Sequence, residues 1–344
     1  MKVSNLQELK SAAEKLLQEQ PKLRTLDVAN QLGVKERDLV EAECCGIKST
    51  YLGEDTKNVF KALPGLGEVM ALSRNPWCVH ERHGEYQKLG IGESSQGIVL
   101  GPDIDLRLFF DNWGTAWLVE QGGRQSIQFF DRQGMAIHKV YITDSSNTDG
   151  LAELVETFKQ EKSNIPAYVE AVAKPTYKDV TPALREEWLQ LKDTHDFHPL
   201  LKKHEVRRLD ALKGAGEDLA QQLPKDAIET VLNAAVEKQL PIMCFVANNG
   251  IVQIHGGPIH KLLRTGHWFN ILDPKFNLHL NTNAIDSLWV VNKPTEDGPV
   301  TSLEAYTAQG NLIVQFFGLR KPGIPENPEW RALLESLCTT PLAA

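Results

Sequence analysis

The chain has 344 residues, of which 42% are hydrophobic and 24% charged, and 37 basic against 45 acidic side chains give a net charge of −8. The composition is ordinary for a globular protein, and the acidic balance is unusual for a protein that binds nucleic acid. No stretch approaches the roughly 18 apolar residues of a membrane span, and the start lacks the apolar core of a signal peptide. The five cysteines form no CxxC pair, which favours reduced thiols in the cytoplasm.

Residues 5–45 have the pattern of helices. The segment Leu23–Cys45 resembles a helix-turn-helix with its turn at Gly33. As a DNA reader, its second helix would carry Lys35 and Arg37, but also three glutamates with the wrong sign for phosphate groups. The alternative is a helix pair that serves only for packing.

The rest of the first half changes from strands to helix. Residues 69–142 contain short segments rich in β-branched and aromatic residues, separated by turn formers, which predicts a meander of strands. Residues 148–172 return to a helical pattern, and residues 173–180 are expected to connect two halves.

The second half repeats the first. A helical part at residues 181–239 is followed by a strand-rich part, and two stretches align in register. Asp105–Leu108 matches Asn277–Leu280, and Phe130–Gly134 matches Tyr306–Gly310. These matches predict a tandem duplication of an antiparallel sheet with attached helices, hence an α+β fold, with repeats at residues 1–172 and 173–344.

Two histidines end an apolar stripe that begins after Thr181 and Pro182, which suit a helix start. The stripe consists of Leu184, Trp188, Leu191, His195 and His198. Its spacing fits one helix, if the helix extends so far. Pro199 disfavours a helical His198, so we expect both histidines at or just past the helix end. The pattern is compatible with core packing, or with an imidazole that binds a metal in an apolar cavity beside basic side chains.

The last predicted strand also carries polar residues. Ile313, Gln315 and Phe317 alternate onto one face, and Arg320 follows shortly after. A polar side chain on a core-facing strand is costly unless a partner satisfies it. Gln315 and Arg320 are therefore expected either to pair with neighbouring backbone or acids, or to serve a ligand.

Several short motifs follow one another in a particular order. They are Trp188-x-x-Leu-x-Asp193-x-His195-x-Phe197, Val206-x-Arg208, Lys293-Pro294-Thr-x-Asp-Gly, Gln309-Gly310, and Gln315-Phe316-Phe317-Gly318-x-Arg320-Lys-Pro-Gly. Their order and spacing resemble the HemS/ChuS/HmuS/PhuS family of bacterial hemin-handling proteins over nearly the whole chain. The resemblance implies two repeats whose sheets stack into a large central β core, and heme b (iron protoporphyrin IX) bound in the carboxy-terminal half.

The resemblance also implies roles for individual residues. His195 matches the proximal iron ligand, and a neutral imidazole is a common axial ligand of heme. Its second ring nitrogen needs an acceptor, for which Asp193 and Asp196 are both available. Arg107 matches the distal arginine and is the expected catalytic residue, with Phe109 beside it on the same strand face.

The remaining matched residues surround the ligand. Those expected near the propionates and the rim are Arg208, Lys293, Gln315 and Arg320, since guanidinium groups suit carboxylates. Those expected to line the porphyrin are Phe197, Phe245 and Phe317. Phe317 departs from the family where some members carry tyrosine. His198 is not general in the family, and it is expected either to exchange with His195 as ligand or to be a surface histidine.

The function that the resemblance implies is that of a cytoplasmic heme-binding protein of a bacterial heme-uptake system. It would degrade heme to release iron, deliver heme to a degrading enzyme, or both. Degradation would need an external electron donor, since the chain has no flavin or nicotinamide fingerprint. Expected partners are heme, a heme ABC importer and a downstream heme oxygenase or reductase, with the chain as monomer or dimer and no nucleic acid. The alternative is a heme-responsive DNA-binding regulator that uses the helix-turn-helix-like segment.

Overall fold

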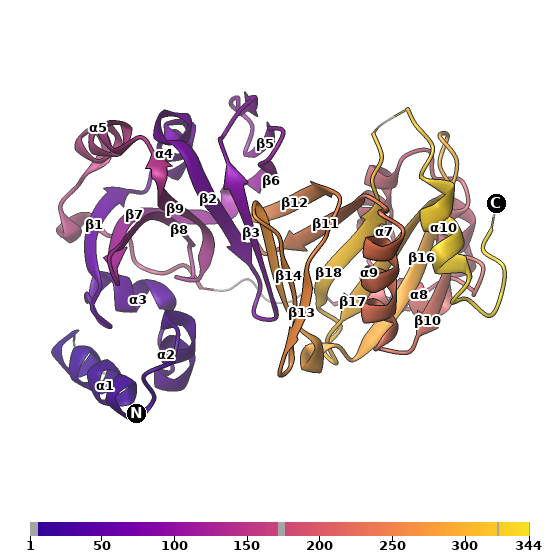
Figure 1. The fold of residues 1–344 in the computed structure, drawn as a ribbon, viewed down its shortest axis with the longest axis horizontal. Helices are drawn as coiled ribbons and strands as arrows, with labels where there is room; N and C mark the ends of the chain where they lie inside the picture. The colour runs from indigo at the N-terminus through magenta and orange to yellow at the C-terminus, as the bar shows by residue number, and fades with distance from the viewer. Residues whose placement is uncertain (1–5, 171–175, 322, 344) are drawn as a thin grey trace. The chain divides into compact units, whose positions relative to one another are not determined.

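The computed structural model describes residues 6–170, 176–321 and 323–343 (Figure 1). Within these ranges the strands form two nine-stranded antiparallel sheets accompanied by helices, so the predicted α+β class is confirmed. The chain divides into two compact units, each described here by itself. Unit 1 comprises residues 1–74, 81–172 and 247–253, and unit 2 comprises residues 75–80, 173–246 and 254–344.

Unit 1 begins with three helices, α1 (Leu6–Glu19), α2 (Thr25–Leu32) and α3 (Glu36–Glu41), and continues into a sheet. Two further helices, α4 (Thr56–Lys61) and α5 (Thr148–Phe158), occur later in the unit. Five strands lie in the order β1-β7-β8-β9-β2, with bounds Lys48–Gly53, Trp113–Gln121, Arg124–Asp131, Ala136–Ser146 and Gly67–Arg74. Unit 1 also contains a ribbon of three strands paired in the order β4-β5-β6, with bounds Leu89–Gly90, Gln96–Leu100 and Asp105–Phe109.

Unit 2 repeats this order of elements. Its helices are α6 (Pro182–Trp188), α7 (Phe197–His204), α8 (Arg208–Gly214), α9 (Ala227–Glu237) and α10 (Pro328–Glu335). Its strands lie in the order β10-β16-β17-β18-β11, with bounds Ala220–Leu223, Ser287–Lys293, Val300–Tyr306, Leu312–Gly318 and Ile242–Ala247. The ribbon is β13 (Leu262–Thr265), β14 (Trp268–Leu272) and β15 (Phe276–Asn281). Strands β3 (Cys78–Gly84) and β12 (Ile251–Gly257) are divided between the units.

The duplication extends to details of the helical parts. Helices α2 and α7 have the same length, and each ends at a residue in the left-handed conformation, Gly33 (φ 68°) and Glu205 (φ 55°). A valine and a basic N-cap residue then lead into α3 and α8. The left-handed residue closes the last turn of the helix and turns the chain into the next one. The residues of α2 and α3 can therefore be aligned one by one with those of α7 and α8.

The sheets repeat in register as well. Cross-strand neighbours on β7, β8 and β9 are Trp117, Gln128 and Lys139, and the matching neighbours on β16, β17 and β18 are Trp289, Glu304 and Gln315. Position 128 in unit 1 thus corresponds to position 304 in unit 2. This correspondence allows the two units to be compared side chain by side chain.

The sheet of unit 2 is buried on both faces. One face packs on α9 and α10 through residues such as Leu232, Leu303, Phe316 and Trp330. The other packs on α6, α7 and α8 through Trp188, Phe197, Leu209, Trp289 and Tyr306. Every residue of β16 and β17 is buried, because alternate side chains enter one core or the other.

The two histidines were expected at or just past the end of one helix, and only His195 lies outside an α-helix. Helix α6 ends at Trp188, a 3-10 turn covers Thr194–Asp196, and α7 starts at Phe197. His198 lies inside α7, so the expectation that Pro199 excludes it from a helix is wrong. Proline is tolerated in a first turn, where its missing N–H would have had no intrahelical acceptor. The helix predicted over residues 148–172 likewise stops at Phe158, after which Lys159 is extended.

A β-bulge corrects the expected face of the last strand. Tyr306 pairs with Leu312 and Ala305 pairs with Val314, so Ile313 is the extra residue. Ile313 joins the core beneath α9 and α10 together with Val314. Only Gln315 and Phe317 of the predicted trio share a face, because the bulge reverses the alternation before them.

The helix-turn-helix-like segment is a packing element. Helix α3 has six residues and buries Glu36, Arg37, Leu39 and Val40. The guanidinium of Arg37 donates a hydrogen bond to the Pro166 carbonyl (3.0 Å) and lies 3.9 Å from the centre of the Tyr168 ring. A DNA-reading helix needs such side chains free to enter a groove, so the burial favours the packing interpretation. Within the described ranges, no helix has the length and apolar character required to cross a membrane.

Candidate functional site

A buried ion pair lies in unit 2 between the sheet and α8. Arg208 opens α8, and its Nε and Nη2 groups donate to the two carboxylate oxygens of Glu304 at 2.9 and 2.6 Å. Glu304 on β17 is fully buried. The paired geometry is the strongest that a guanidinium and a carboxylate form.

Four further side chains donate to the same carboxylate. They are Lys293 (3.4 Å), Ser302 (2.8 Å), Tyr306 (2.5 Å) and Gln315 (2.9 Å), from β16, β17 and β18. We call Glu304 and its five donors, Arg208 included, the Glu304 cluster. It unites three of the four residues that sequence comparison assigned to the propionates.

The charges in the Glu304 cluster depend on one another. Burial opposes ionisation of Glu304, but attraction to Arg208 and Lys293 outweighs burial and lowers the pKa of Glu304. Burial lowers the pKa of Lys293 to about 8, although Glu304 acts in the opposite direction. With both cations protonated against one carboxylate, the Glu304 cluster carries one surplus positive charge.

Aromatic rings border the two cations. Phe197 is buried against Trp188 at a centroid distance of 4.4 Å, and the Arg208 guanidinium and Lys293 ammonium lie 4.8 and 5.1 Å from the Phe197 centroid. Lys293 also lies 5.6 Å from the ring of Phe317, which contacts Phe245 at 5.0 Å. Phe317 and Phe245 are half-buried. Partly exposed aromatic faces next to a surplus positive charge suit a flat, apolar ligand with an acidic group.

His195 lies on the 3-10 turn before α7, with 79% of its side chain exposed. Asp193 caps this turn by accepting the backbone N–H of His195 (2.8 Å), and the same oxygen lies 2.6 Å from Nδ1 of the ring. A proton on Nδ1 that points to Asp193 leaves the Nε2 lone pair available for a metal. Of the two candidate acceptors, Asp193 is therefore the partner.

His198 lies on the first turn of α7 with an exposed side chain. Partial burial of the ring, together with Arg208 and Lys202, lowers the pKa of His198. The neutral imidazole that results at neutral pH is the form that binds metals.

Arg320 lies in a network of loops in unit 2. It pairs with Asp297 at 3.2 Å, and the adjacent Glu296 donates its backbone N–H to the carbonyl of Lys192 (3.0 Å). The loop before His195 and the segment after β18 are thus joined through residues 296–297. Both Gln315 and Arg320 pair with acids, which was one of the two expectations from sequence.

Arg107 and Phe109 lie on β6 of unit 1. As predicted, they share the half-buried face of this strand. Arg107 forms an ion pair with Asp105 and donates a hydrogen bond to the Leu106 carbonyl (3.2 Å). The assignment of these two residues to a ligand stays a prediction.

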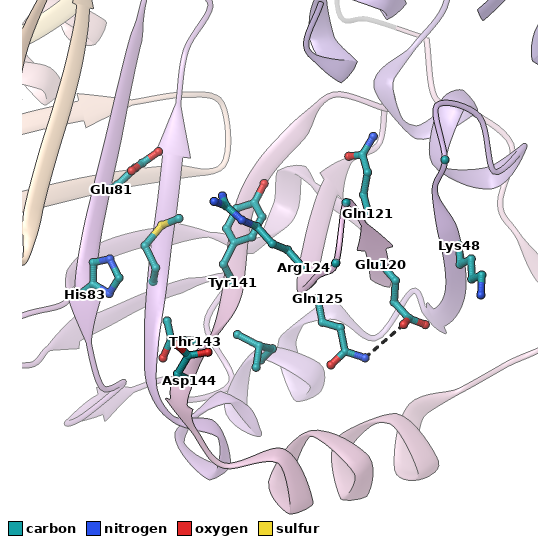
Figure 2. Close-up of a pocket in the computed structure, with 15 residues that line it drawn as sticks. Lys48, Glu81, His83, Glu120, Gln121, Arg124, Gln125, Tyr141, Thr143 and Asp144 are labelled. Carbon is teal, nitrogen blue, oxygen red and sulfur yellow. Dashed lines mark hydrogen bonds between the residues drawn. The ribbon is translucent and has the colours of Figure 1, made fainter. Parts of the chain in front are cut away.

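Unit 1 contains a cavity of about 830 Å³, which was not predicted (Figure 2). Its lining is polar and carries both signs of charge, with Lys48, Glu81, His83, Arg124, Tyr141 and Asp144 among the lining residues. In Figure 2, Glu81 and His83 lie on one side of the cavity and Glu120 with Gln125 on the other.

Register relates this cavity to the aromatic region of unit 2. Tyr141 pairs with Ser126 and Met70, as Phe317 pairs with Ser302 and Met243. Val34 and Val206 are matching residues of the two units. Leu23 precedes Val34 by the same number of residues as His195 precedes Val206, so Leu23 occupies the position of His195. The cavity of unit 1 thus has tyrosine in place of Phe317 and no imidazole at the position of His195.

Glu304 is the site residue that sequence comparison missed. Its signal was a lone acid between Ser302 and Tyr306 in a predicted strand without any other charged residue, where an unpaired carboxylate would be costly. In the described part of the chain, no group of three or more His, Cys, Asp or Glu side chains could hold a metal ion.

Comparisons with known proteins show which family and which structures the chain resembles. The family model for haemin-degrading HemS.ChuX domains matches residues 33–158 and 205–337. The hemin transport protein HemS of Yersinia enterocolitica is 36% identical over 347 residues, which cover 97% of this chain and 99% of HemS. Apo-PhuS, a heme-binding protein from Pseudomonas aeruginosa, superposes with a TM-score of 0.93 at 44% identity, covering 97% and 99% of the two chains. The Escherichia coli O157:H7 heme degrading enzyme ChuS gives 0.91 at 33% identity, covering 97% and 100%.

Proposed function

The chain belongs to the family of haemin-degrading HemS.ChuX domains, and we propose that it binds one heme b through unit 2 in a bacterial heme-uptake system. The observation that carries the proposal is the arrangement around His195. An exposed imidazole is held by Asp193 with Nε2 turned away from the carboxylate. It lies two residues before Phe197, whose ring contacts both cations of the Glu304 cluster.

These residues fit heme by their chemistry. A porphyrin supplies four nitrogen ligands to iron, so a single imidazole completes the protein's share of the coordination. Asp193 makes the His195 ring a better donor and holds its orientation. Arg208 and Lys293 supply positive charge for a propionate, and Phe317 and Phe245 supply apolar surface for the ring. Arg320 would bind a propionate at the rim. It would either leave Asp297 to do so or contact both carboxylates at once.

The proposed role is to receive imported heme in the cytoplasm and to degrade it, to pass it on, or both. HemS is named a transport protein and ChuS a heme oxygenase, so the family includes both descriptions. Bound heme would supply the iron at which dioxygen reacts, with electrons from an external donor. The protein would hold heme through His195, keep the ring against apolar side chains, and retain the propionates. An importer would act before it, and a reductase or a second oxygenase after it.

The test of binding is a spectral titration of the wild-type protein with hemin. We expect saturation at one equivalent. His195→Ala should shift the Soret band and lower the affinity by more than tenfold, unless His198 replaces the lost ligand, which His195→Ala/His198→Ala would reveal. A double variant that keeps the wild-type spectrum would show that neither histidine is the ligand.

The test of activity is a single-turnover reaction of the heme complex with a chemical reductant in air. Loss of the Soret band with release of iron to a chelator identifies a degrading enzyme. A Soret band that persists without release of iron, followed by transfer of heme to a purified heme oxygenase, identifies a carrier.

A further inference from the structure

We propose that Glu304 is a positioning residue of the anion site: it orients Arg208 and Lys293, offsets one of their two positive charges, and leaves the other for a single ligand carboxylate. The inference rests on the proposed function, since it names how this site receives an acidic ligand.

The hydrogen bonds to Glu304 show why it acts through its neighbours. Both carboxylate oxygens already accept bonds from five side chains, and the residue has no exposed surface. Its bonds to Arg208 use Nε and Nη2, so Nη1 of the guanidinium is left for a further acceptor. Glu304 therefore fixes the direction in which Arg208 presents its remaining donor.

The charge count determines what the site accepts. Arg208 and Lys293 together carry two positive charges, which Glu304 reduces to one. Lys293 lies between the Phe197 and Phe317 rings at 5.1 and 5.6 Å, where water is largely excluded. One carboxylate entering here neutralises the cluster. A second carboxylate of the same ligand would find no cation left here and must be bound elsewhere.

Without Glu304, the lysine would be protonated in fewer molecules. The charged groups that act on Lys293 are Arg208 from α8, Glu304 from β17 and Glu326 before α10. Tyr306 on β17 contacts Arg208 and Glu304. Burial and the charge of Arg208 together lower the pKa of Lys293 to about 8, against the attraction of Glu304. Loss of the Glu304 charge should lower the pKa of Lys293 further, so that a larger share of empty sites holds a neutral amine at pH 7.

The prediction is a change in proton uptake when an acidic ligand binds. In the wild type an entering carboxylate raises the pKa of Lys293, and uptake should be about 0.5 proton at pH 8 and about 0.1 at pH 7. In Glu304→Gln, uptake at pH 7 should be larger than in the wild type. Affinity at pH 7 should then fall, because protonation of Lys293 consumes part of the binding free energy.

The experiment uses metal-free protoporphyrin IX, which has both carboxylates and no iron-bound water to titrate. Calorimetry of the full-length protein in buffers of different ionisation enthalpy gives the protons taken up. The dimethyl ester of the same porphyrin should take up none with either protein. Lys293→Gln should abolish the uptake at pH 8.

The matched control is Glu36→Gln in unit 1. Glu36 is equally buried and also pairs with one lysine and one arginine, but it lies outside the proposed site. Its loss should leave proton uptake at the wild-type value. If Glu304→Gln does not fold, Glu304→Asp keeps the charge on a shorter arm: uptake should stay at the wild-type value while affinity falls.

Two results would overturn the inference. One is a folded Glu304→Gln protein with wild-type uptake at pH 7, and the other is a folded Glu304→Asp protein with wild-type affinity. Failure of the proposed function is a separate result: wild-type protein that binds neither hemin nor protoporphyrin. If hemin binds with a His195-dependent spectrum and the Glu304 variants are silent, only the role of Glu304 is wrong.

Discussion

The two units bury the same set of charges in opposite arrangements. In unit 1 the carboxylate belongs to helix α3: Glu36 accepts from Lys139 (2.8 Å) on β9 and from Arg74 (2.6 Å) on β2. In unit 2 the carboxylate belongs to strand β17, and Arg208 on helix α8 reaches it. Glu36 and Arg208 occupy matching positions, as do Lys139 and Gln315. Each cluster holds one carboxylate and two cations, so charge number does not separate the units.

What separates the units is the surroundings of the cations. Lys293 lies beside the partly exposed Phe317 ring, whereas Lys139 and Arg74 are absent from the lining of the unit 1 cavity. In unit 1 the carboxylate comes from the helix and both cations come from strands. In unit 2 the carboxylate comes from a strand, and the cations, Arg208 on the helix and Lys293 on a strand, lie beside aromatic side chains. The charge cluster thus has the same position in both units. Whether its carboxylate comes from the helix or from the strand determines which side chains surround its cations.

The largest expected effect is on stability and concerns Glu36. Glu36→Gln leaves two buried cations without a counter-ion, which should cost about 3–5 kcal/mol of unfolding free energy. Burial opposes ionisation of Glu36, but Lys139 and Arg74 lower its pKa to about 2. Its contribution is therefore fully present above the unfolded pKa near 4.5 and is lost as pH falls toward 2. Urea unfolding at pH 7 measures the loss.

The control for Glu36→Gln is Glu153→Gln on the exposed face of α5, which should change stability by less than about 0.5 kcal/mol. A loss for Glu36→Gln as small as that of the control would mean that the ion cluster of unit 1 contributes little. The comparison between the clusters would then concern access alone.

The second effect concerns acid sensitivity of unit 1. His138 is buried between the Ser73 hydroxyl (2.8 Å) and the Tyr86 hydroxyl (2.5 Å), and burial lowers its pKa to about 3. The unfolded imidazole binds a proton near pH 6.5 and the folded one does not, so stability falls as pH drops from 6.5 toward 3. The fall from pH 7 to 4.5 should be about 2–3 kcal/mol for this group.

His138→Gln should remove this slope, whatever it costs at pH 7. The measurement is the urea midpoint of both proteins at pH 7 and pH 4.5. Equal slopes in wild type and variant would assign the acid sensitivity to other groups.

A smaller effect separates two arginines. Arg320→Ala should lower heme affinity by up to about tenfold, or 1.4 kcal/mol, without a change of Soret band, because a partly exposed ion pair contributes little.

The resemblance assigns Arg107 to the distal side, so Arg107→Ala should change product yield more than affinity. Lys178→Ala, at an exposed pair with Glu205, is the control. Fast heme loss from Arg107→Ala with normal reactivity would contradict this division.

The last variant is expected to leave the heme stoichiometry unchanged. Leu23→His places an imidazole in unit 1 at the position that matches His195. Heme titration should still saturate at one equivalent, because Pro21 stands where Asp193 would hold the ring and Thr25 stands where Phe197 would lie. A second equivalent with an altered spectrum would show that the imidazole alone limits binding in unit 1.

Much of the fold was predictable from local sequence. The alternation of apolar residues predicted most of the strands of both units, and the match of Phe130–Gly134 to Tyr306–Gly310 indicated duplication. Short elements such as β10 were missed, since four residues carry too little periodicity to recognise. The break after Trp188 was also missed, because the apolar spacing continues across a turn that Asp193 and His195 stabilise with a local hydrogen bond.

By itself, the sequence determined the α+β class and the tandem repeat, and its resemblance to a known family supplied the residues proposed to hold a ligand. Only the tertiary structure decided which groups meet. It selected Asp193 over Asp196 as the partner of His195, moved Ile313 to the opposite core through a bulge, and made Glu304 the centre of the cations. The physical reason is that these outcomes depend on register and on contacts between residues about 100 positions apart, such as Arg208 and Glu304. Periodicity reports which face a side chain occupies, but the partner across that face is set by how the sheet and helices pack.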